Sequence, residues 1–149
     1  MDRAFPIRRQ EITPAQIIER LDLRPHPEGG WYRETVRRPA PGGGRDALTA
    51  IHFLLDHGQR SHWHRVDADE LWLWHVGTPM SLRIADCDTI TDHRLGTDIL
   101  AGHAPQVLVS AGAWQEAEAT DGWSLVSCVV VPGFDFAGFE LASPGWSPG

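Results

Sequence analysis

Residues 61–77, SHWHRVDADELWLWHVG, hold the densest group of side chains suited to chemistry in this sequence. His62 and His64 stand two positions apart, so they point to the same side if their segment is an extended strand. Glu70 opens the next apolar segment. Two imidazoles and a carboxylate offered from adjacent strands suit a divalent transition metal with open coordination positions. The same groups could instead serve as a general base, a partner that tunes it and a hydrogen-bonding anchor.

A second group of candidates lies in the segment GWYRETVRR. Tyr32 is the only tyrosine and could act as a general acid, although a lone tyrosine at the start of a strand is more often a packing residue. Arg33 and Glu34 face opposite ways, and whichever points inward could meet a substrate, so Glu34 is a candidate pocket residue. Nucleophilic catalysis has no support, because no G-x-S-x-G elbow occurs. Cys87 and Cys128 are expected to be buried structural thiols.

Three tryptophans also bear on a ligand site. Trp72, Trp74 and Trp114 can fill the interior of a β-barrel, and at least one is expected to form a flat wall of a pocket for a ring-shaped ligand. His26 stands beside turn residues and is expected to be exposed to solvent.

These residues must be positioned mainly by strands. Thr13, Pro14 and Gln16 form a capping pattern that predicts one short helix over about residues 13–22. Eight later segments are strand-sized and rich in β-branched or aromatic residues, and turn residues separate them. They are GWYRETVRR, ALTAIHFLL, ELWLWHV, MSLRIADC, DHRLG, PQVLVSAG, WSLVSCVVV and FAGFELA. The pattern predicts an all-β sandwich or barrel over about residues 29–142.

Length and composition limit the alternatives. A chain of 149 residues suits a single domain, 1–149. The net charge is −7 and basic residues form no run, which argues against a nucleic-acid or anionic-membrane partner. No apolar run approaches the length of a membrane span, and the N-terminus lacks a signal pattern, so a cytoplasmic protein is expected.

The segment from Gly58 to Gly77 resembles the first motif of the cupin superfamily, a glycine, then His-x-His, then a glutamate that six residues separate from another glycine. Five residues separate His64 from Glu70, where most cupins have three or four. The run 110–115, SAGAWQ, resembles the second motif, with Gln115 in place of its histidine. The resemblance implies a metal site of His62, His64, Glu70 and Gln115 for Zn, Ni, Fe or Mn. Gln115 would weaken such a site, because an amide oxygen is a poorer ligand than imidazole.

A closer resemblance covers nearly the whole chain. HPEGGWYRETVRR, TAIHFLL, SHWHRVDADELWLWH, VSAGAWQEAEA and VVPGFDFAGFELA are similar, in this order, to the cupin type-5 family, defined as a domain of unknown function. The family implies a double-stranded β-helix, or jelly-roll barrel, usually a homodimer, with a pocket inside each barrel. Its members have been likened to sugar epimerases. GGWYRE is also similar to the Arg-Gly-x-Phe-x-x-Glu strand of dTDP-sugar epimerases, with Glu28 at the arginine position.

The function that follows is a cupin that binds a small polar, sugar-like or carbonyl-containing molecule, with epimerase or isomerase chemistry. His64, Glu70 and Tyr32 are its candidate catalytic residues. The alternative is a non-catalytic binding or sensing cupin, which Gln115 favours. A metal-dependent dioxygenase is the weaker alternative.

Overall fold

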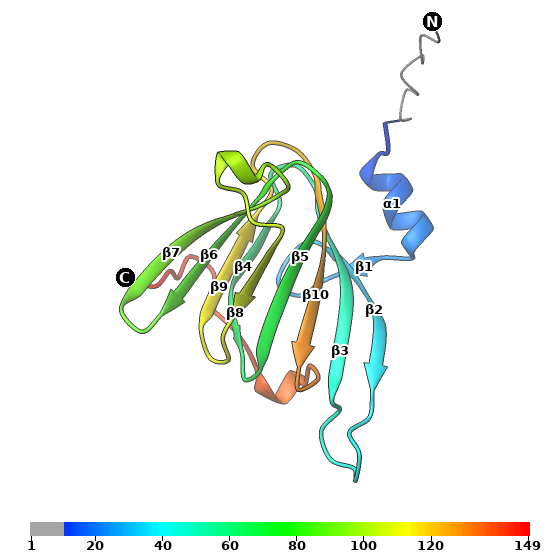
Figure 1. The fold of residues 1–149 in the computed structure, drawn as a ribbon, viewed down its shortest axis with the longest axis vertical. Coiled ribbons are helices and arrows are strands. Elements are labelled where there is room, and N and C mark those ends of the chain that lie inside the picture. Colours follow the sequence, from blue (N-terminus) through cyan, green and yellow to red (C-terminus); the bar gives the residue numbers. More distant parts are fainter. Residues whose placement is uncertain (1–10) are drawn as a thin grey trace, which may run out of the picture.

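The computed structural model describes residues 11–149, and the first ten residues of the expected domain lie outside this range. Helix α1 spans Pro14–Leu21 and is capped as the sequence predicts: the Thr13 side chain accepts from the backbone N–H of Gln16, and the Gln16 side chain accepts from that of Thr13. Ile17 is buried with Leu23 and Leu54, which fastens α1 outside the sheets, beside β1 and β2 (Figure 1). No helix in the described part of the chain is long and apolar enough to cross a membrane.

Two antiparallel sheets face each other and make the predicted jelly-roll barrel (Figure 1). The first has the order β1-β2-β3-β10-β5-β8, with β1 Arg24–Pro25, β2 Trp31–Arg38, β3 Leu48–Leu55, β10 Ser124–Val131, β5 Asp69–Gly77 and β8 Gln106–Val109. The second has the order β11-β4-β9-β6-β7, with β11 Phe139–Leu141, β4 Arg60–Val66, β9 Trp114–Glu118, β6 Met80–Asp86 and β7 Thr89–Leu95. Two 3₁₀ turns, η1 Ile99–Ala101 and η2 Phe136–Gly138, complete the described elements.

The interior divides into an apolar part and a polar part. Phe53, Trp72, Met80, Leu82 and Val126 are fully buried between the sheets and form the centre of the main core. Burial of such side chains stabilises the fold by roughly 1.5–3 kcal/mol each. The polar residues His64, Glu70 and Gln115 are also buried in the barrel, at 2%, 7% and 1% exposure. Because buried polar groups must find partners there, this end of the barrel is the candidate site.

The strand predictions hold for most segments, with two differences in the strands and one at a cysteine. Strands β4 and β9 lie outside the eight listed segments, although β4 was considered as an extended segment that carries His62 and His64, and the segment of β9 resembles the second cupin motif. The segment FAGFELA is a 3₁₀ turn followed by a three-residue strand, because Phe136–Gly138 turns at the Asp135 cap before β11. Cys87 is exposed, not buried as expected, since it lies in the β6–β7 turn at φ 53°, whereas Cys128 is buried in the core.

Candidate functional site

A cavity opens between the two sheets at the end of the barrel near η2. Its floor carries Glu28, His64 and Glu70, and its walls include His26, Tyr32, Thr49 and Ile51. Three phenylalanines, Phe134, Phe136 and Phe139, line its neck, and Glu34 and Arg37 complete the lining at the mouth. The cavity is narrow, about 70 Å³, so it suits a small molecule or the reactive end of a larger one.

A bulge in β4 decides which histidine reaches this cavity. The pairing of β4 with β9 shifts register between Ser61 and His64, so two residues of β4 oppose one of β9. The bulge breaks the strict alternation that predicted one side for both imidazoles. His64 is buried on the cavity floor, whereas His62 Nε2 contacts the carbonyl oxygen of Ser143 at 2.9 Å, in the C-terminal segment. Of the two imidazole rings, therefore, only that of His64 lines the cavity.

His64 is held in one tautomer. Its Nδ1 lies 2.7 Å from the carbonyl oxygen of His62, which can only accept, so Nδ1 carries a proton. In the neutral ring, Nε2 then has a lone pair. Nε2 lies 3.1 Å from Oε2 of Glu28, and two lone pairs at that distance would repel, so a proton must reside on one of these two atoms.

Electrostatics place that proton on the carboxyl group. Burial raises the pKa of Glu28 to about 8 and lowers the pKa of His64. Burial also raises the pKa of Glu70 to about 7, so the floor holds two carboxyl groups that titrate near neutral pH. Groups with pKa values near the operating pH are the ones suited to general acid–base catalysis.

Glu28 and His26 were not among the predicted site residues. Glu28 sits in the loop before β2, and its carbonyl accepts from the backbone N–H of His62 at 2.9 Å, which fixes the loop against β4. The side chain of His26 is only 8% exposed, contrary to the expectation of a solvent-exposed ring. Its Nδ1 accepts from the Glu28 backbone N–H at 3.1 Å, and burial lowers its pKa to about 4, so the ring is neutral. The sequence signal that could have identified this loop is the pair Gly29 and Gly30 after Glu28, because glycines often occur where one backbone segment packs closely against another.

Gln115 is tied to its neighbours by its amide. The indole Nε1 of Trp72 can only donate, and it donates to Gln115 Oε1 at 2.8 Å. The orientation of the amide is thereby fixed, and Gln115 Nε2 donates to Oε2 of Glu70 at 2.8 Å. The structure thus brings His64, Glu70 and Gln115 together on facing strands, with Trp72 behind them in the core.

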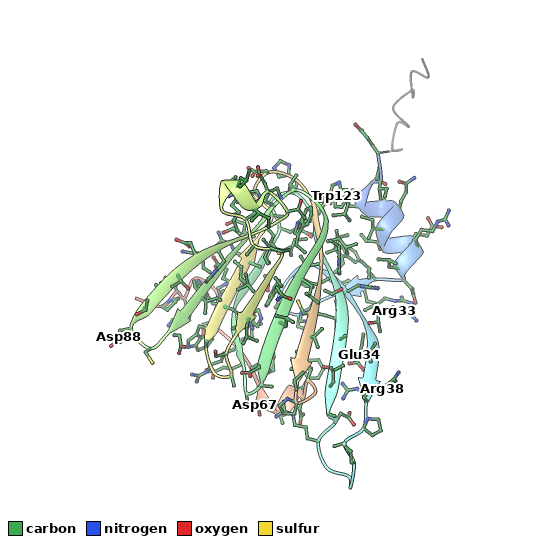
Figure 2. The ribbon with its side chains drawn as sticks, viewed as in Figure 1. Arg33, Glu34, Arg38, Asp67, Asp88 and Trp123 are labelled. Carbon is green, nitrogen blue, oxygen red and sulfur yellow. The ribbon has the colours of Figure 1, made fainter. Side chains whose placement is uncertain are left out.

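The other expected pocket residues divide between the cavity and the outside. Tyr32 and Glu34 line the cavity, while Arg33 points away and pairs with Asp22 at 3.0 Å (Figure 2). Trp74 packs on the main core, with its Nε1 donating to Ser124 and Thr78. Trp114 lies against Trp146 on the outer side of β9, at 4.6 Å between ring centroids. Neither Trp72, Trp74 nor Trp114 is part of the cavity lining.

The residues present do not fit the four-ligand cupin metal centre. His62 is directed elsewhere, the only amide oxygen of Gln115 accepts from Trp72, and Nε2 of His64 meets Glu28. Within residues 11–149, no group of three or more His, Cys, Asp or Glu side chains has an arrangement that could hold a metal ion.

Solved structures of other proteins share this architecture, and a further relative is similar in sequence. A hypothetical protein from Leishmania major is 34% identical, with a TM-score of 0.81 over 89% of this chain and 88% of that one. Protein SO0799 from Shewanella oneidensis is 38% identical, with a TM-score of 0.83 over 89% of this chain and 85% of that one. The uncharacterized protein YML079W of Saccharomyces cerevisiae is 27% identical over 81% of this chain and 71% of its own length.

A more distant similarity concerns the fold alone. Oxalate decarboxylase from Bacillus subtilis, a protein with Mn(II) centres, has a TM-score of 0.59 at 16% identity, over 82% of this chain and 31% of that one. The family described as Cupin superfamily (DUF985) matches residues 15–142, which include both sheets and the whole cavity floor. The chain is a member of this cupin family.

Proposed function

We propose that this cupin is an epimerase- or isomerase-type enzyme that binds a small carbonyl-containing molecule in the barrel cavity. The observation that carries the proposal is the buried group of Glu28, His64 and Glu70, in which both carboxyl groups have raised pKa values. Fully buried carboxyl groups are costly to the fold, and their collection in one cavity is typical of functional sites.

Each group has a role that its contacts favour. Glu70 Oε2 accepts from Gln115, while no partner of Oε1 is found among the described residues, which leaves Oε1 free to take a proton from the carbon next to the carbonyl group. The enolate that results needs a donor at its oxygen. Tyr32 on the cavity wall would donate it, because the one proton of Glu28 is already shared with Nε2 of His64. Delivery of a proton from solvent to the opposite face of that carbon, while Glu70 releases its proton to solvent, gives the epimer. Transfer of the proton on Glu70 to the former carbonyl carbon, as the hydroxyl group on the first carbon loses its proton and becomes the new carbonyl group, gives the isomer.

The test is hydrogen exchange without knowledge of the natural substrate. Unphosphorylated aldoses, ketoses and 2-oxo compounds are incubated in D₂O with the protein, and loss of the C–H signal next to the carbonyl group is followed by NMR. We expect exchange with at least one compound class, and a loss of at least about a hundredfold in Glu70→Gln, in the range of general base catalysis. Asp88→Asn makes the same change of charge at the remote β6–β7 turn and should leave exchange unchanged (Figure 2).

A non-catalytic binding cupin is the second candidate. The amide of Gln115 favours this candidate. It occupies the position of the histidine in the second cupin motif, and its hydrogen bonds to Trp72 and Glu70 give it a structural role instead of a role as metal ligand or base. Saturable binding of a compound with no exchange over hours, at a protein concentration well above the dissociation constant, would support this candidate against the enzyme.

We propose a homodimer formed through β2. One edge of β2 pairs with β3, and the short β1 covers only Trp31 and Tyr32 on the other edge. Most of that second edge lacks a backbone partner in the described chain, and such edges can pair across a two-fold axis. Light scattering at micromolar concentration should give twice the chain mass of 16.5 kDa, and a monomer mass would contradict the proposal.

A further inference from the structure

The cavity lining contains few groups that could bind an anionic ligand. Three acidic side chains line it, Glu28, Glu34 and Glu70, against one basic side chain, Arg37. The two histidines of the lining, His26 and His64, are neutral at pH 7 because burial lowers the pKa of both. An anionic ligand would therefore depend on Arg37 alone.

Arg37 is already neutralised by its neighbours. Its Nε and Nη2 donate to the two oxygens of Glu34 at 2.7 and 2.9 Å, and Nη1 donates to Asp46 at 2.6 Å. A further contact of Nη2 reaches the carbonyl oxygen of Phe134 at 3.4 Å. Four of the five N–H donors of the guanidinium group are engaged, and two carboxylates balance its single charge. An incoming carboxylate or phosphate would have to displace Glu34 or Asp46.

The floor of the cavity favours a cationic ligand over an anionic one. Glu70 is only 7% exposed and lines the cavity, and its Oε1 has no hydrogen-bond partner among the described residues. Glu28 stands on the same floor against His64. An ammonium group that enters this space can donate hydrogen bonds to the oxygens of both carboxyl groups, which are good acceptors for a charged donor.

The neck offers an apolar and aromatic surface above that floor. Ring centroids lie 4.9 Å apart for Phe134 and Phe136, 5.7 Å for Phe134 and Phe139, and 6.2 Å for Phe136 and Phe139. Phe136 is 62% exposed at the mouth, an unusual place for a large apolar side chain unless it contacts a ligand or another surface. Aromatic faces attract cations and pack against flat rings.

We infer that the cavity takes a small molecule with an ammonium group, which contacts Glu28 and Glu70 on the floor, while its ring or apolar body packs against Phe134, Phe136 and Phe139. The inference rests on the proposed function, because it assumes that this cavity is the substrate site. It narrows the substrate class to amino-bearing carbonyl compounds and disfavours phosphorylated sugars and sugar nucleotides.

Three probes that share one ring separate the effect of charge from the effect of shape. Benzylamine is a cation at pH 7, benzyl alcohol is neutral and benzoate is an anion. NMR titration of the complete chain gives the dissociation constant of each. We expect benzylamine to bind at least about tenfold more tightly than benzoate, which corresponds to about 1.4 kcal/mol, with the alcohol between them. Equal or tighter binding of benzoate, or binding of none of the three in the millimolar range, would overturn the inference.

Variants test whether the preference among the three probes arises in the cavity. Glu70→Gln should reduce the preference for benzylamine over benzyl alcohol, and Phe136→Ala should weaken both by a similar factor. Glu34→Gln should improve benzoate binding, because it leaves Arg37 with a single carboxylate. Asp88→Asn, with the same charge change at a remote turn, should alter none of the three constants. If Glu70→Gln fails to fold by circular dichroism, Glu28→Gln provides the same comparison.

The two proposals fail separately. Preference for benzylamine without deuterium exchange on any amino-bearing carbonyl compound would reject the enzymatic function and leave the ammonium site in place. Deuterium exchange confined to anionic substrates, with benzoate preferred over benzylamine, would support the enzyme and reject the ammonium site.

Discussion

Nε2 of His64 lies 3.1 Å from Oε2 of Glu28, on the floor of the barrel, while Nδ1 of the same ring meets the carbonyl oxygen of His62 at 2.7 Å. This relationship changes the role of His64. Its Nε2, the only ring atom available to act as a base, is already in contact with a carboxyl group. In the proposed function the free base of the cavity is therefore Glu70, and His64 with Glu28 forms a proton-holding pair beside it.

The raised pKa of Glu28 predicts how stability depends on pH. The folded state binds a proton up to about pH 8, whereas the unfolded state releases it near 4.5. Because the folded state holds more protons between these values, the free energy of unfolding falls as pH rises through this window. Glu28→Gln cannot ionise, so its free energy of unfolding should exceed that of the wild type increasingly from pH 5 to 9. The difference should reach a few kcal/mol, since one pKa unit is worth about 1.4 kcal/mol.

Urea unfolding at several pH values measures this difference. Glu140→Gln is the matched control, because Glu140 is exposed and pairs with Arg65 at the surface. A difference between Glu28→Gln and wild type that does not change with pH would mean that Glu28 is ionised throughout.

The Gln115 amide predicts a large loss of stability when it is removed. Gln115→Leu keeps the approximate volume but leaves the buried Trp72 indole N–H and one oxygen of Glu70 without partners. Each buried unsatisfied group costs about 1–3 kcal/mol, so we expect a loss of about 2–4 kcal/mol in urea unfolding. Gln106→Leu, on the exposed side of β8, should change stability by less than about 0.5 kcal/mol. Similar values for both variants would show that the amide network is not formed.

The position of Glu28 on the cavity floor depends on the close contact of Gly29 with β4. Gly29 has φ +109°, and a Cβ there would overlap the carbonyl oxygen of Arg60 in β4. Gly29→Ala must therefore push the loop away from β4 and displace Glu28 from His64. We expect a loss of stability of a few kcal/mol, of the size of overpacking and backbone strain combined. Gly42→Ala has a similarly positive φ of +87° with no atom within 4 Å, so it isolates the strain of the backbone. An equal effect of the two variants would refute the close contact.

The arrangement of His62, His64, Glu70 and Gln115 predicts the metal content. Protein prepared without nickel resin or chelator should hold far less than one equivalent of Zn, Mn, Fe or Ni by elemental analysis. The physical reason is that the donor atoms are committed to Ser143, Glu28 and Trp72. One equivalent of metal in the wild type that is lost in His64→Ala would show that these contacts rearrange around an ion.

Sequence patterns predicted the barrel because strand propensity, turn residues and the capping box are local signals, and each needs only a few neighbouring residues. The same patterns identified His64, Glu70 and Gln115, which the structure brings together. They placed His62 beside His64 because strict alternation cannot reveal a β-bulge, which arises from pairing with β9. They left out Glu28 because its burial depends on a loop that packs against a strand about thirty residues later.

The aromatic neck was also beyond sequence reasoning. Phe134 and Phe136 lie between β10 and β11, and Phe139 is the first residue of β11. In the sequence this segment looks like a turn followed by a strand. Only the three-dimensional fold brings this segment over the cavity that Glu28, His64 and Glu70 close from below. The tryptophans were expected to fill the barrel, with at least one of them forming a wall of the pocket. Trp72 and Trp74 do pack in the main core, but Trp114 lies on the outer side of β9 and none of the three lines the cavity.

The most direct test of the account is the titration of the two floor carboxyl groups by NMR, on protein labelled with ¹³C at the glutamate side-chain carboxyl carbons. Comparison of the wild type with Glu28→Gln and Glu70→Gln assigns the signals. Burial of Glu28 and Glu70 predicts two carboxyl groups whose coupled titrations have apparent pKa values near 7 and 8, well above the ordinary value of 4.5. If both carboxyl groups titrated near 4.5, the floor would be fully ionised at neutral pH and could not act as the proton-holding site described above.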